Sequence, residues 1–482
     1  MGLFCCENCL SSAAKVMLGL QIVLRSCRAA QKGSIRKISA LYITGDKANE
    51  NYATLQPYLD FAGTFDEAAS LEQSIASRGL DISLESVFRK YQKYQTHHEQ
   101  LQRVVGEREA VTKNLKELTK KGGSEQQIEE LKEQGKTLRN DLKALKQALY
   151  PIEDDFIHDF LHLPNRLHAQ CPTGDQEVLL YRHSLPGSTS NVPSHLERKD
   201  LIHFVDNNRY YMMEQAAHFD VNAMQSLGRY FVTKGDFVQT ANPDFVRCVL
   251  LEANATPLAD YHMVREEHLQ NKINTAYLTG GAAFESYLGA MTKLCVYPSV
   301  LPLRYVCCGR SYNRAEAQHY GPTPSLYTAT QTNAVQSFVA TQTADEANAQ
   351  LEHILSLAID FYKALDLPFR IVYAPAASLT PSESLRAVIE VYASSLQRYV
   401  CVGRISNYGD FVSKRILFST RREKHYDFLH LVGGPVLYTT RLIAALLEHN
   451  IRLEDCKLVG ASSSGGKHTM EQDLQQFKDL FT

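Results

Sequence analysis

Several short patterns in this chain of 482 residues contain side chains that could bind phosphate or metal, but most of them lack the spacing that such sites require. Residues 461–468, Ala-Ser-Ser-Ser-Gly-Gly-Lys-His, resemble a phosphate-binding loop, but the first glycine is out of register and histidine replaces the hydroxyl residue. Cys6 and Cys9 are spaced like metal ligands, whereas the adjacent Cys307 and Cys308 cannot easily share one tetrahedral site. From these patterns we expect neither a nucleotide loop nor a zinc site, and free thiols rather than disulfides.

Lysine and arginine side chains recur along two stretches that have helical periodicity. Because the net charge of the chain is −2, any contact with nucleic acid has to come from such local clusters. Acidic residues are interspersed among them, so the solvated face of a dimerisation or spacer coil is the alternative interpretation. The candidate RNA-binding side chains are Lys113, Lys116, Lys120, Lys121, Lys132, Lys136, Arg139 and Lys143.

The two stretches that carry these side chains follow a heptad pattern. The first has steps of four and three, at Val87, Tyr91, Tyr94, His98, Leu101, Val105, Arg108, Thr112, Leu115 and Leu118. Turn residues interrupt it at 120–124, and a second stripe follows at Ile128, Leu131, Gly135, Leu138, Leu142, Leu145, Leu149 and Ile152. This arrangement predicts one antiparallel coiled-coil hairpin over residues 84–152, with helices about 40–50 Å long.

Beyond the hairpin, short β-branched and aromatic runs alternate with longer helical segments. We expect strands at Tyr230–Thr233, Leu303–Cys307, Arg370–Ala374 and Tyr399–Val402, and a helix over Thr343–Leu365. A βαβ rhythm with a glycine-rich loop is missing, so the sequence favours an α+β core with a mixed, mostly antiparallel sheet flanked by helices over a Rossmann-type fold. We expect a helical domain at 41–160, a linker at 161–175, the core at 176–455 and a tail at 456–482.

The N-terminus has the composition of a mitochondrial transit peptide. Glu7 is the only acid before Asp46, while lysine, arginine and serine are frequent. The apolar run Val16–Leu24 is too short to span a bilayer, so we expect no membrane segment. Residues 1–40 are therefore predicted to direct import into the mitochondrial matrix, with cleavage between Arg36 and Asp46. An ordinary basic tail or a poor secretory signal is the alternative.

Several landmarks occur in a fixed order along the chain: Leu163-Pro164-Asn165 after the hairpin, then Gly228–Phe231, Ser406–Tyr408 and Arg441–Glu448. In this order they resemble seryl-tRNA synthetases, which are class II aminoacyl-tRNA synthetases, over roughly residues 84–450. Within that family the chain looks like the non-catalytic seryl-tRNA synthetase-like group of insect mitochondria. The resemblance implies a dimeric class II core and a hairpin that lies across the long variable arm of tRNA-Ser, with contacts mainly to the RNA backbone.

The same resemblance assigns active-site positions, beginning with those that hold serine and the α-phosphate. Serine activation needs an acid for the serine ammonium and arginines for the phosphates. The family's Thr-x-Glu, which grips the serine amino group, aligns with Gly281-Ala282-Ala283. The second-motif arginine is either replaced by Asn313 or shifted by one residue to Arg314.

The positions assigned to adenine, metal and the remaining phosphate charge are similarly altered. Gln336 stands where the family has an acid, and the metal-binding glutamate aligns with Cys401, a poor ligand for Mg²⁺. Of the phosphate arginines, only Arg441 clearly remains. Since losing one electrostatic contributor lowers a rate by about 10²–10³, we expect no catalytic residue, no bound metal and no cofactor.

Together these observations predict a non-catalytic paralogue that binds tRNA-Ser or other mitochondrial RNA and supports mitochondrial translation. It would form a homodimer, or a heterodimer with the authentic mitochondrial seryl-tRNA synthetase. One alternative is a repurposed class II ligase that uses Glu285, Arg314, Glu316 and Arg441 in a rebuilt ATP pocket. Another is a protein-only scaffold in which the hairpin is a spacer.

Overall fold

The computed structural model describes residues 39–45, 55–122, 124–184, 194–206, 209–264, 275–314, 320–321, 323–422 and 425–459. All of them belong to one compact unit that begins at Ser39. The predicted transit segment up to residue 38, Glu316 and the phosphate-loop-like residues 461–468 lie outside the described residues.

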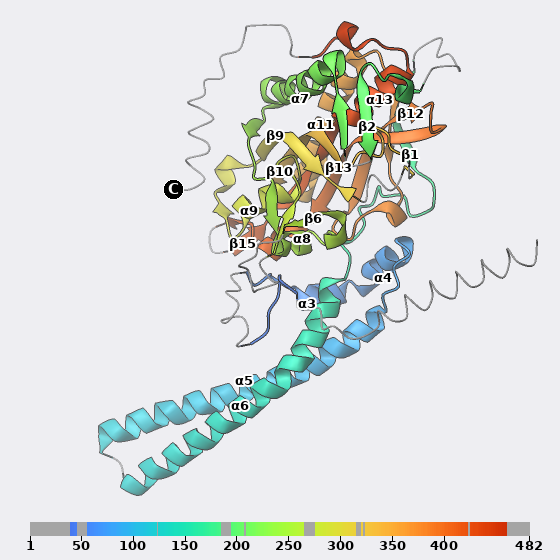
Figure 1. Ribbon diagram of the computed structural model, residues 1–482. Coiled ribbons are helices and arrows are strands. Elements are labelled where there is room, and N and C mark those ends of the chain that lie inside the picture. Colours follow the sequence, from blue (N-terminus) through green and yellow to red (C-terminus); the bar gives the residue numbers. More distant parts are fainter. Residues whose placement is uncertain are drawn as a thin grey trace, which may run out of the picture. The chain divides into compact units, whose positions relative to one another are not determined.

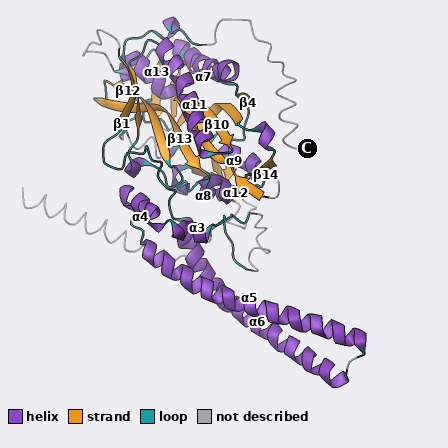
Figure 2. Ribbon diagram, turned by 180° about the vertical axis from the view of Figure 1, so that it is seen from behind, coloured by secondary structure: helices purple, strands orange, loops and turns teal. Residues whose placement is uncertain are grey.

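The predicted coiled-coil hairpin is confirmed by two long antiparallel helices, α5 (Leu84–Lys121) and α6 (Glu125–Leu161), which run side by side in both views (Figures 1 and 2). Ser83 caps α5 by accepting a hydrogen bond from the backbone N–H of Ser86, and Gly122 ends the helix at φ 70°. At 1.5 Å per residue, each helix is about 55 Å long, slightly longer than predicted because α6 continues to Leu161.

The hairpin seam differs from the prediction at one place. Every predicted position of the second stripe is buried or half-buried. In the first helix, however, Arg108 and Thr112 are exposed, and Val111 is buried in their place, at 8% exposure. The physical reason is that a seven-residue step from Val104 to Val111 keeps an apolar side chain in the seam. The predicted steps would bury a guanidinium there instead.

Two short helices, α3 (Phe61–Asp66) and α4 (Ala68–Ser77), precede the hairpin. Rings from α3, α5 and α6 gather at the base of the hairpin, where Phe61 contacts Phe156 at 5.0 Å and Phe160 at 4.9 Å between centroids. These side chains belong to the same hydrophobic cluster as core residues such as Tyr408 and Phe418. The base of the arm therefore packs against the core directly.

The core is built on an eight-stranded sheet, as the α+β prediction required (Figure 1). Neighbouring strands are antiparallel except for one parallel pair, β4 with β9, at one edge. In spatial order the strands are β1 (Val178–His183), β11 (Phe369–Tyr373), β12 (Leu385–Ala393), β13 (Arg398–Gly409), β16 (His430–Tyr438), β10 (Gln331–Thr341), β9 (Leu303–Tyr312) and β4 (Val238–Thr240).

Alternating strand residues divide between the two faces of the sheet. In β10, Val335 and Val339 join the cluster that includes three helices, α7 (Glu214–Gly235), α11 (Ala344–Ala364) and α13 (Thr439–Glu448). Phe338 and Ala340 belong to the other cluster, shared with the hairpin base. This period of two is what a sheet buried on both faces requires.

One predicted strand is wrong. Tyr230–Thr233 lies within the helix α7, not in the sheet. The aromatic and β-branched composition of the run was misleading, because Phe219, Ala223, Leu227 and Phe231 are buried at helical spacing and fix its conformation. The other predicted strands and the predicted helix, observed as α11, are confirmed.

Smaller elements complete the described core. They are β2 (Ile202–Asp206), β3 (Arg209–Met212), β5 (Phe245–Arg247), β6 (His262–Val264), β7 (Ala276–Leu278), β8 (Cys295–Val296), β14 (Ser419–Arg422), β15 (His425–Phe428), α8 (Cys248–Ala253), α9 (Glu285–Met291) and α12 (Phe411–Ile416). Single 3₁₀ turns occur at η1 (His195–Glu197), η2 (Leu258–Asp260), η4 (Pro298–Val300), η5 (Ala376–Ser378) and η6 (Leu453–Asp455). Within the described ranges, no helix has the length and apolarity needed to cross a bilayer.

Candidate nucleotide-type pocket and RNA-binding arm

The positions that the sequence assigned to an active site gather around one cavity of about 800 Å³ on the sheet. Its lining includes Ala283, Asn313, Gln336, Cys401 and Arg441, contributed by β10, β13, α13 and the segments that flank α9 and β9. Five of the assigned positions therefore line one cavity, and that they form a degenerate active site stays a prediction.

Two predicted positions lie beside the cavity without lining it. The backbone N–H of Gly281 donates to Asp244 Oδ1 at 2.7 Å, and a Cβ on this glycine would lie 2.8 Å from the carbonyl oxygen of Asn242. A threonine here would therefore need the neighbouring backbone to move. Arg314 is exposed and is not part of the lining, so the structure does not bring it to the cavity.

Arg441 is engaged by the chain itself. It is 5% exposed, and its Nη1 donates to the carbonyl oxygen of Cys401 at 3.0 Å. Its guanidinium lies over the ring of Tyr438, 4.6 Å from the centroid, and over Tyr320 at 5.1 Å. The Tyr320 hydroxyl in turn accepts a hydrogen bond from the backbone N–H of Cys401. The contacts on this guanidinium are thus intramolecular, which favours a packing role.

A second arginine, Arg370, is held between two acids and a ring. It pairs with Glu390 at 2.7 Å and with Glu177, and its guanidinium stacks 3.6 Å from the centroid of Tyr399. Burial raises the pKa of Glu390, and the charge of Arg370 opposes that shift. The strand register explains the contact, because Arg370 on β11 lies directly opposite Glu390 on β12.

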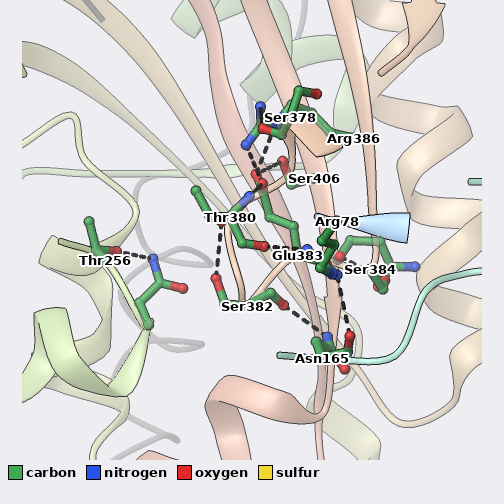
Figure 3. Close-up of polar contacts among 12 residues, drawn as sticks. Arg78, Asn165, Thr256, Ser378, Thr380, Ser382, Glu383, Ser384, Arg386 and Ser406 are labelled. Atoms are coloured by element: carbon green, nitrogen blue, oxygen red, sulfur yellow. Dashed lines mark hydrogen bonds and ion pairs between the residues drawn. The ribbon is translucent and has the colours of Figure 1, made fainter. Parts of the chain in front are cut away.

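Arg386 and Glu383 form the third ion pair at the cavity wall (Figure 3). Burial alone would raise the pKa of Glu383, but Arg386, through its charge and a hydrogen bond, lowers it to about 2, with Arg404 and Ser406 adding to the effect. The Ser406 hydroxyl donates to this carboxylate at 2.6 Å. The acid is therefore a fixed anion of the fold.

The backbone around Glu383 is held from the helical domain by Arg78, which follows α4 (Figure 3). Arg78 is 6% exposed, and it donates to the carbonyl oxygens of Thr380 at 2.8 Å, Asn165 at 3.3 Å and Glu383. Asn165, which belongs to the Leu-Pro-Asn landmark, donates to the carbonyl oxygens of Ser382 and Tyr408, both at 2.8 Å. This landmark thus joins the helical domain to the cavity wall.

The neutral side chains of the cavity offer little to a phosphate or a hard cation. Gln336 is 1% exposed and donates to the carbonyl oxygen of Ser337 at 2.9 Å. The Cys401 thiol lies 3.4 Å from the carbonyl oxygen of Gly403, and a soft sulfur does not fit a Mg²⁺ ion. Across the described ranges, no group of three His, Cys, Asp or Glu side chains gathers closely enough to hold a metal ion.

Glu285, the first residue of α9, is the acid nearest in sequence to the altered Thr-x-Glu positions. It is 5% exposed and accepts hydrogen bonds from Asn254 and Thr256, both at 2.9 Å, and a longer one from Tyr261 at 3.5 Å. These three neutral donors hold its carboxylate against the cavity wall.

Sequence reasoning missed the ion pairs of the cavity wall and Tyr320. A signal was present for part of them. In β12 the residues Arg386, Val388 and Glu390 alternate with the fully buried Ala387 and Ile389. A period of two therefore places the charged side chains of Arg386 and Glu390 on the same face of the strand. Charged residues alternating with apolar ones on a central strand indicate a polar cavity above that face.

The basic surface of the α5–α6 hairpin is the second candidate site. All eight candidate basic side chains, shared equally between α5 and α6, are exposed along the hairpin. Lys132 pairs with Glu129 at 3.2 Å and Lys136 with Glu133 at 3.6 Å, both in the weak surface geometry of neighbouring helical turns. The arrangement can contact a phosphate backbone from two adjacent helices at once.

Comparisons with known proteins agree with this architecture. A family model described as the seryl-tRNA synthetase N-terminal domain matches residues 59–167. The chain is 78% identical over 466 residues to the serine–tRNA synthetase-like protein Slimp of Drosophila melanogaster, covering 97% of this chain and 100% of that one. It is 26% identical to the mitochondrial serine–tRNA ligase of Mus musculus, covering 86% and 84% of the two chains.

Solved structures extend the match to the fold. Seryl-tRNA synthetase from Pyrococcus horikoshii, complexed with ATP, superposes with a TM-score of 0.69 at 18% identity, covering 81% of this chain and 94% of that one. The cytoplasmic enzyme of Naegleria fowleri, in complex with AMP, gives 0.66 at 14% identity, covering 86% and 94%. The chain belongs to the seryl-tRNA synthetase family, in its synthetase-like branch, and has the class II synthetase fold.

Proposed function

We propose that this protein is a non-catalytic seryl-tRNA synthetase paralogue of the mitochondrial matrix. It binds tRNA-Ser or other mitochondrial RNA through the α5–α6 hairpin, without binding ATP or serylating the RNA, and thereby supports mitochondrial translation. The observation that carries the proposal is that three arginines of the cavity, Arg370, Arg386 and Arg441, are engaged by acids, carbonyl groups and rings of the same chain.

ATP binding to such a cavity would have to break contacts already made. Arg370 and Arg386 would have to leave Glu390 and Glu383, and Arg441 would have to leave two rings and a carbonyl group. Separating a desolvated ion pair leaves a buried charge without its partner and costs about 3–5 kcal/mol. A polyphosphate therefore finds these three arginines already engaged.

RNA binding is supported by the exposed basic side chains of the hairpin. The charge reversal of Lys113, Lys116, Lys120 and Lys121 to glutamate removes the four candidates on α5. If each contacts one phosphate, the slope of log affinity against log salt falls by about 3. The control K199E/K234E changes exposed lysines of the core and should leave the slope unchanged.

The same proposal includes a partner, either a second copy or the authentic mitochondrial seryl-tRNA synthetase. In support, β4 is an edge strand of the main sheet, and β5, which follows it in the chain, begins with Phe245, which is 56% exposed. Met263 of β6, the other edge strand of the small sheet β5-β7-β6, is 50% exposed. Exposed apolar side chains on open edge strands suit a protein interface.

The deciding experiment is paired. Protein lacking the transit-like leader is titrated with ATP by calorimetry and with labelled mitochondrial tRNA-Ser by filter binding. RNA binding without ATP binding supports the proposal, whereas ATP binding refutes it. Co-purification from mitochondria tests the partner: if the synthetase is absent and is not destabilised by depletion of this protein, the heterodimer is excluded.

The repurposed-ligase alternative has weaker support. Among its four residues, Arg314 is exposed away from the cavity, Glu285 is held by three neutral donors, and Arg441 is engaged as described. A ligase of this class also requires ATP, so the calorimetric titration decides between the two functions.

A further inference from the structure

The first described residues of the chain are anchored on a single carboxylate. Glu252 Oε2, near the end of α8, accepts hydrogen bonds from the Ser39 hydroxyl at 2.8 Å, the backbone N–H of Ala40 at 2.8 Å and that of Leu41 at 3.0 Å. The Ser39 hydroxyl also accepts from the N–H groups of Leu41 and Tyr42, at 3.1 and 3.2 Å. Residues 39–42 therefore form a local hydrogen-bonded turn that is held on Glu252.

The side chains that follow are buried among residues distant in the sequence. Leu41 is 1% exposed and lies in the hydrophobic cluster shared with the hairpin base, while Ala40 belongs to a separate cluster around α8. Two adjacent residues of one short peptide thus pack into two different hydrophobic clusters, one at the hairpin base and one around α8. Such burial removes the leucine side chain from water and stabilises the fold directly.

Contacts with α6 hold the remainder of this peptide. The Tyr42 hydroxyl donates to Glu153 and the Thr44 hydroxyl to Asp154. Gly45 has a φ of +58°, and a Cβ there would lie 2.6 Å from the ring of Tyr150, so the position also requires glycine. We call Ser39–Gly45 the N-terminal clasp, because it links α8 of the core to α6 of the hairpin.

From these contacts we propose that the mature protein begins no later than Ser39, because import processing cuts the chain between Arg36 and Ser39 and leaves the clasp intact. The proposal rests on the mitochondrial import included in the proposed function. It places the end of the leader before residue 40, the boundary that composition predicts. A cut beyond Leu41 would remove all three donors from Glu252 and the buried leucine together.

The chemical step is the hydrolysis of one peptide bond. Water adds across the bond, leaving a carboxylate on the released leader and an α-ammonium on the first residue of the mature chain. A cut here leaves all three groups that donate to the Glu252 carboxylate on the mature chain.

The test is the N-terminal peptide of the endogenous protein, identified by mass spectrometry after purification from mitochondria. A first residue at 37, 38 or 39 supports the proposal, and a first residue at Ala40 or later overturns it. An intact leader on a cytosolic protein overturns the proposed localisation and the processing step with it.

A second measurement tests the clasp without relying on import. Recombinant chains that begin at Arg36, Ser39 and Tyr42 are compared by thermal unfolding. We expect equal midpoints for the first two and a midpoint lower by more than about 3 °C for the third, which lacks the buried leucine and the Glu252 donors. Equal midpoints for all three would refute the clasp, whatever the localisation of the protein.

Discussion

Arg78 gives the sharpest test of how the helical domain is joined to the core. Its side chain is 6% exposed, and it donates to three main-chain carbonyl groups, two of them beside the cavity at Thr380 and Glu383, and one at Asn165. Its Nε donates to the Ser74 hydroxyl at 3.1 Å. In the variant Arg78→Ala, the carbonyl group of Glu383 loses its donor, while those of Asn165 and Thr380 keep one each, from the Ser74 hydroxyl and the backbone N–H of Glu383.

The magnitude follows from the hydrogen bonds that are lost. The Glu383 carbonyl group loses its donor, which costs about 1–3 kcal/mol, whereas the carbonyl groups of Thr380 and Asn165 each lose one of two donors, at about 1 kcal/mol each. Allowing for relaxation around the truncated side chain, we expect the free energy of unfolding to fall by about 3–5 kcal/mol. Arg78→Lys keeps one charged donor group and should lose about half as much.

The assay is denaturant unfolding, with hydrogen exchange of residues 380–384 as a local readout. Arg89→Ala is the matched control, because Arg89 has a side chain that is 73% exposed and pairs with Glu85 one turn away. This control should change the free energy of unfolding by about 0.5 kcal/mol or less. If Arg78→Ala is no more destabilising than Arg89→Ala, or leaves exchange at 380–384 unchanged, the linkage between the domains lies elsewhere.

Further expected outcomes concern the acid limb of stability, a glycine and the hairpin seam. Because Glu383 has a folded-state pKa of about 2, against 4.5 unperturbed, its ionised form contributes about 3 kcal/mol to the free energy of unfolding above pH 4.5. This contribution is lost as the pH falls towards 2, so the stability of E383Q should depend less on pH in this range when unfolding is measured in acid titrations. Gly280→Ala places a Cβ 2.1 Å from a carbonyl oxygen of β9 and should lower the yield of folded protein, whereas Gly122→Ala, also at positive φ but with open space around it, should cost only about 1–2 kcal/mol in denaturant unfolding. Val111→Ala should destabilise the hairpin by about 1–2 kcal/mol in the same assay, and Thr112→Ala should have almost no effect. If Thr112→Ala were the more destabilising change, Thr112 would lie in the seam, as the heptad pattern alone predicts.

The hairpin could be predicted from the sequence because its information is local. Residues three and four apart meet on one helix face, so a stripe of apolar residues specifies both the helix and the seam. The prediction failed only where two registers competed, at Arg108 and Val111. The strand wrongly expected at Tyr230–Thr233 failed for a related reason: its composition favours a strand, but buried residues four apart, such as Leu227 and Phe231, follow a helix.

The cavity was predictable as a set of positions and not as a set of contacts. A resemblance that keeps its landmarks in order predicts which residues lie close together, and Ala283, Gln336 and Cys401 do line one cavity. Whether a charge there is available for a ligand depends instead on which strands become neighbours. Arg370 and Glu390 are close because β11 lies beside β12 in a register that places them opposite each other.

That register also decides the chemistry of the site. A shift of one residue between β11 and β12 would turn every side chain of one strand to the other face, and would move Arg370 away from its acids. The sheet core prevents this shift, because the residues between the charged ones, such as Ile371 and Ile389, are buried at 1% and 0% exposure against the helices of the opposite face. The hydrophobic packing that stabilises the synthetase fold thus also holds the ion pairs that occupy its cavity. A single substitution such as Cys401→Glu would leave Arg370 paired with Glu390 on the neighbouring strand, and Arg386 paired with Glu383 three residues before it.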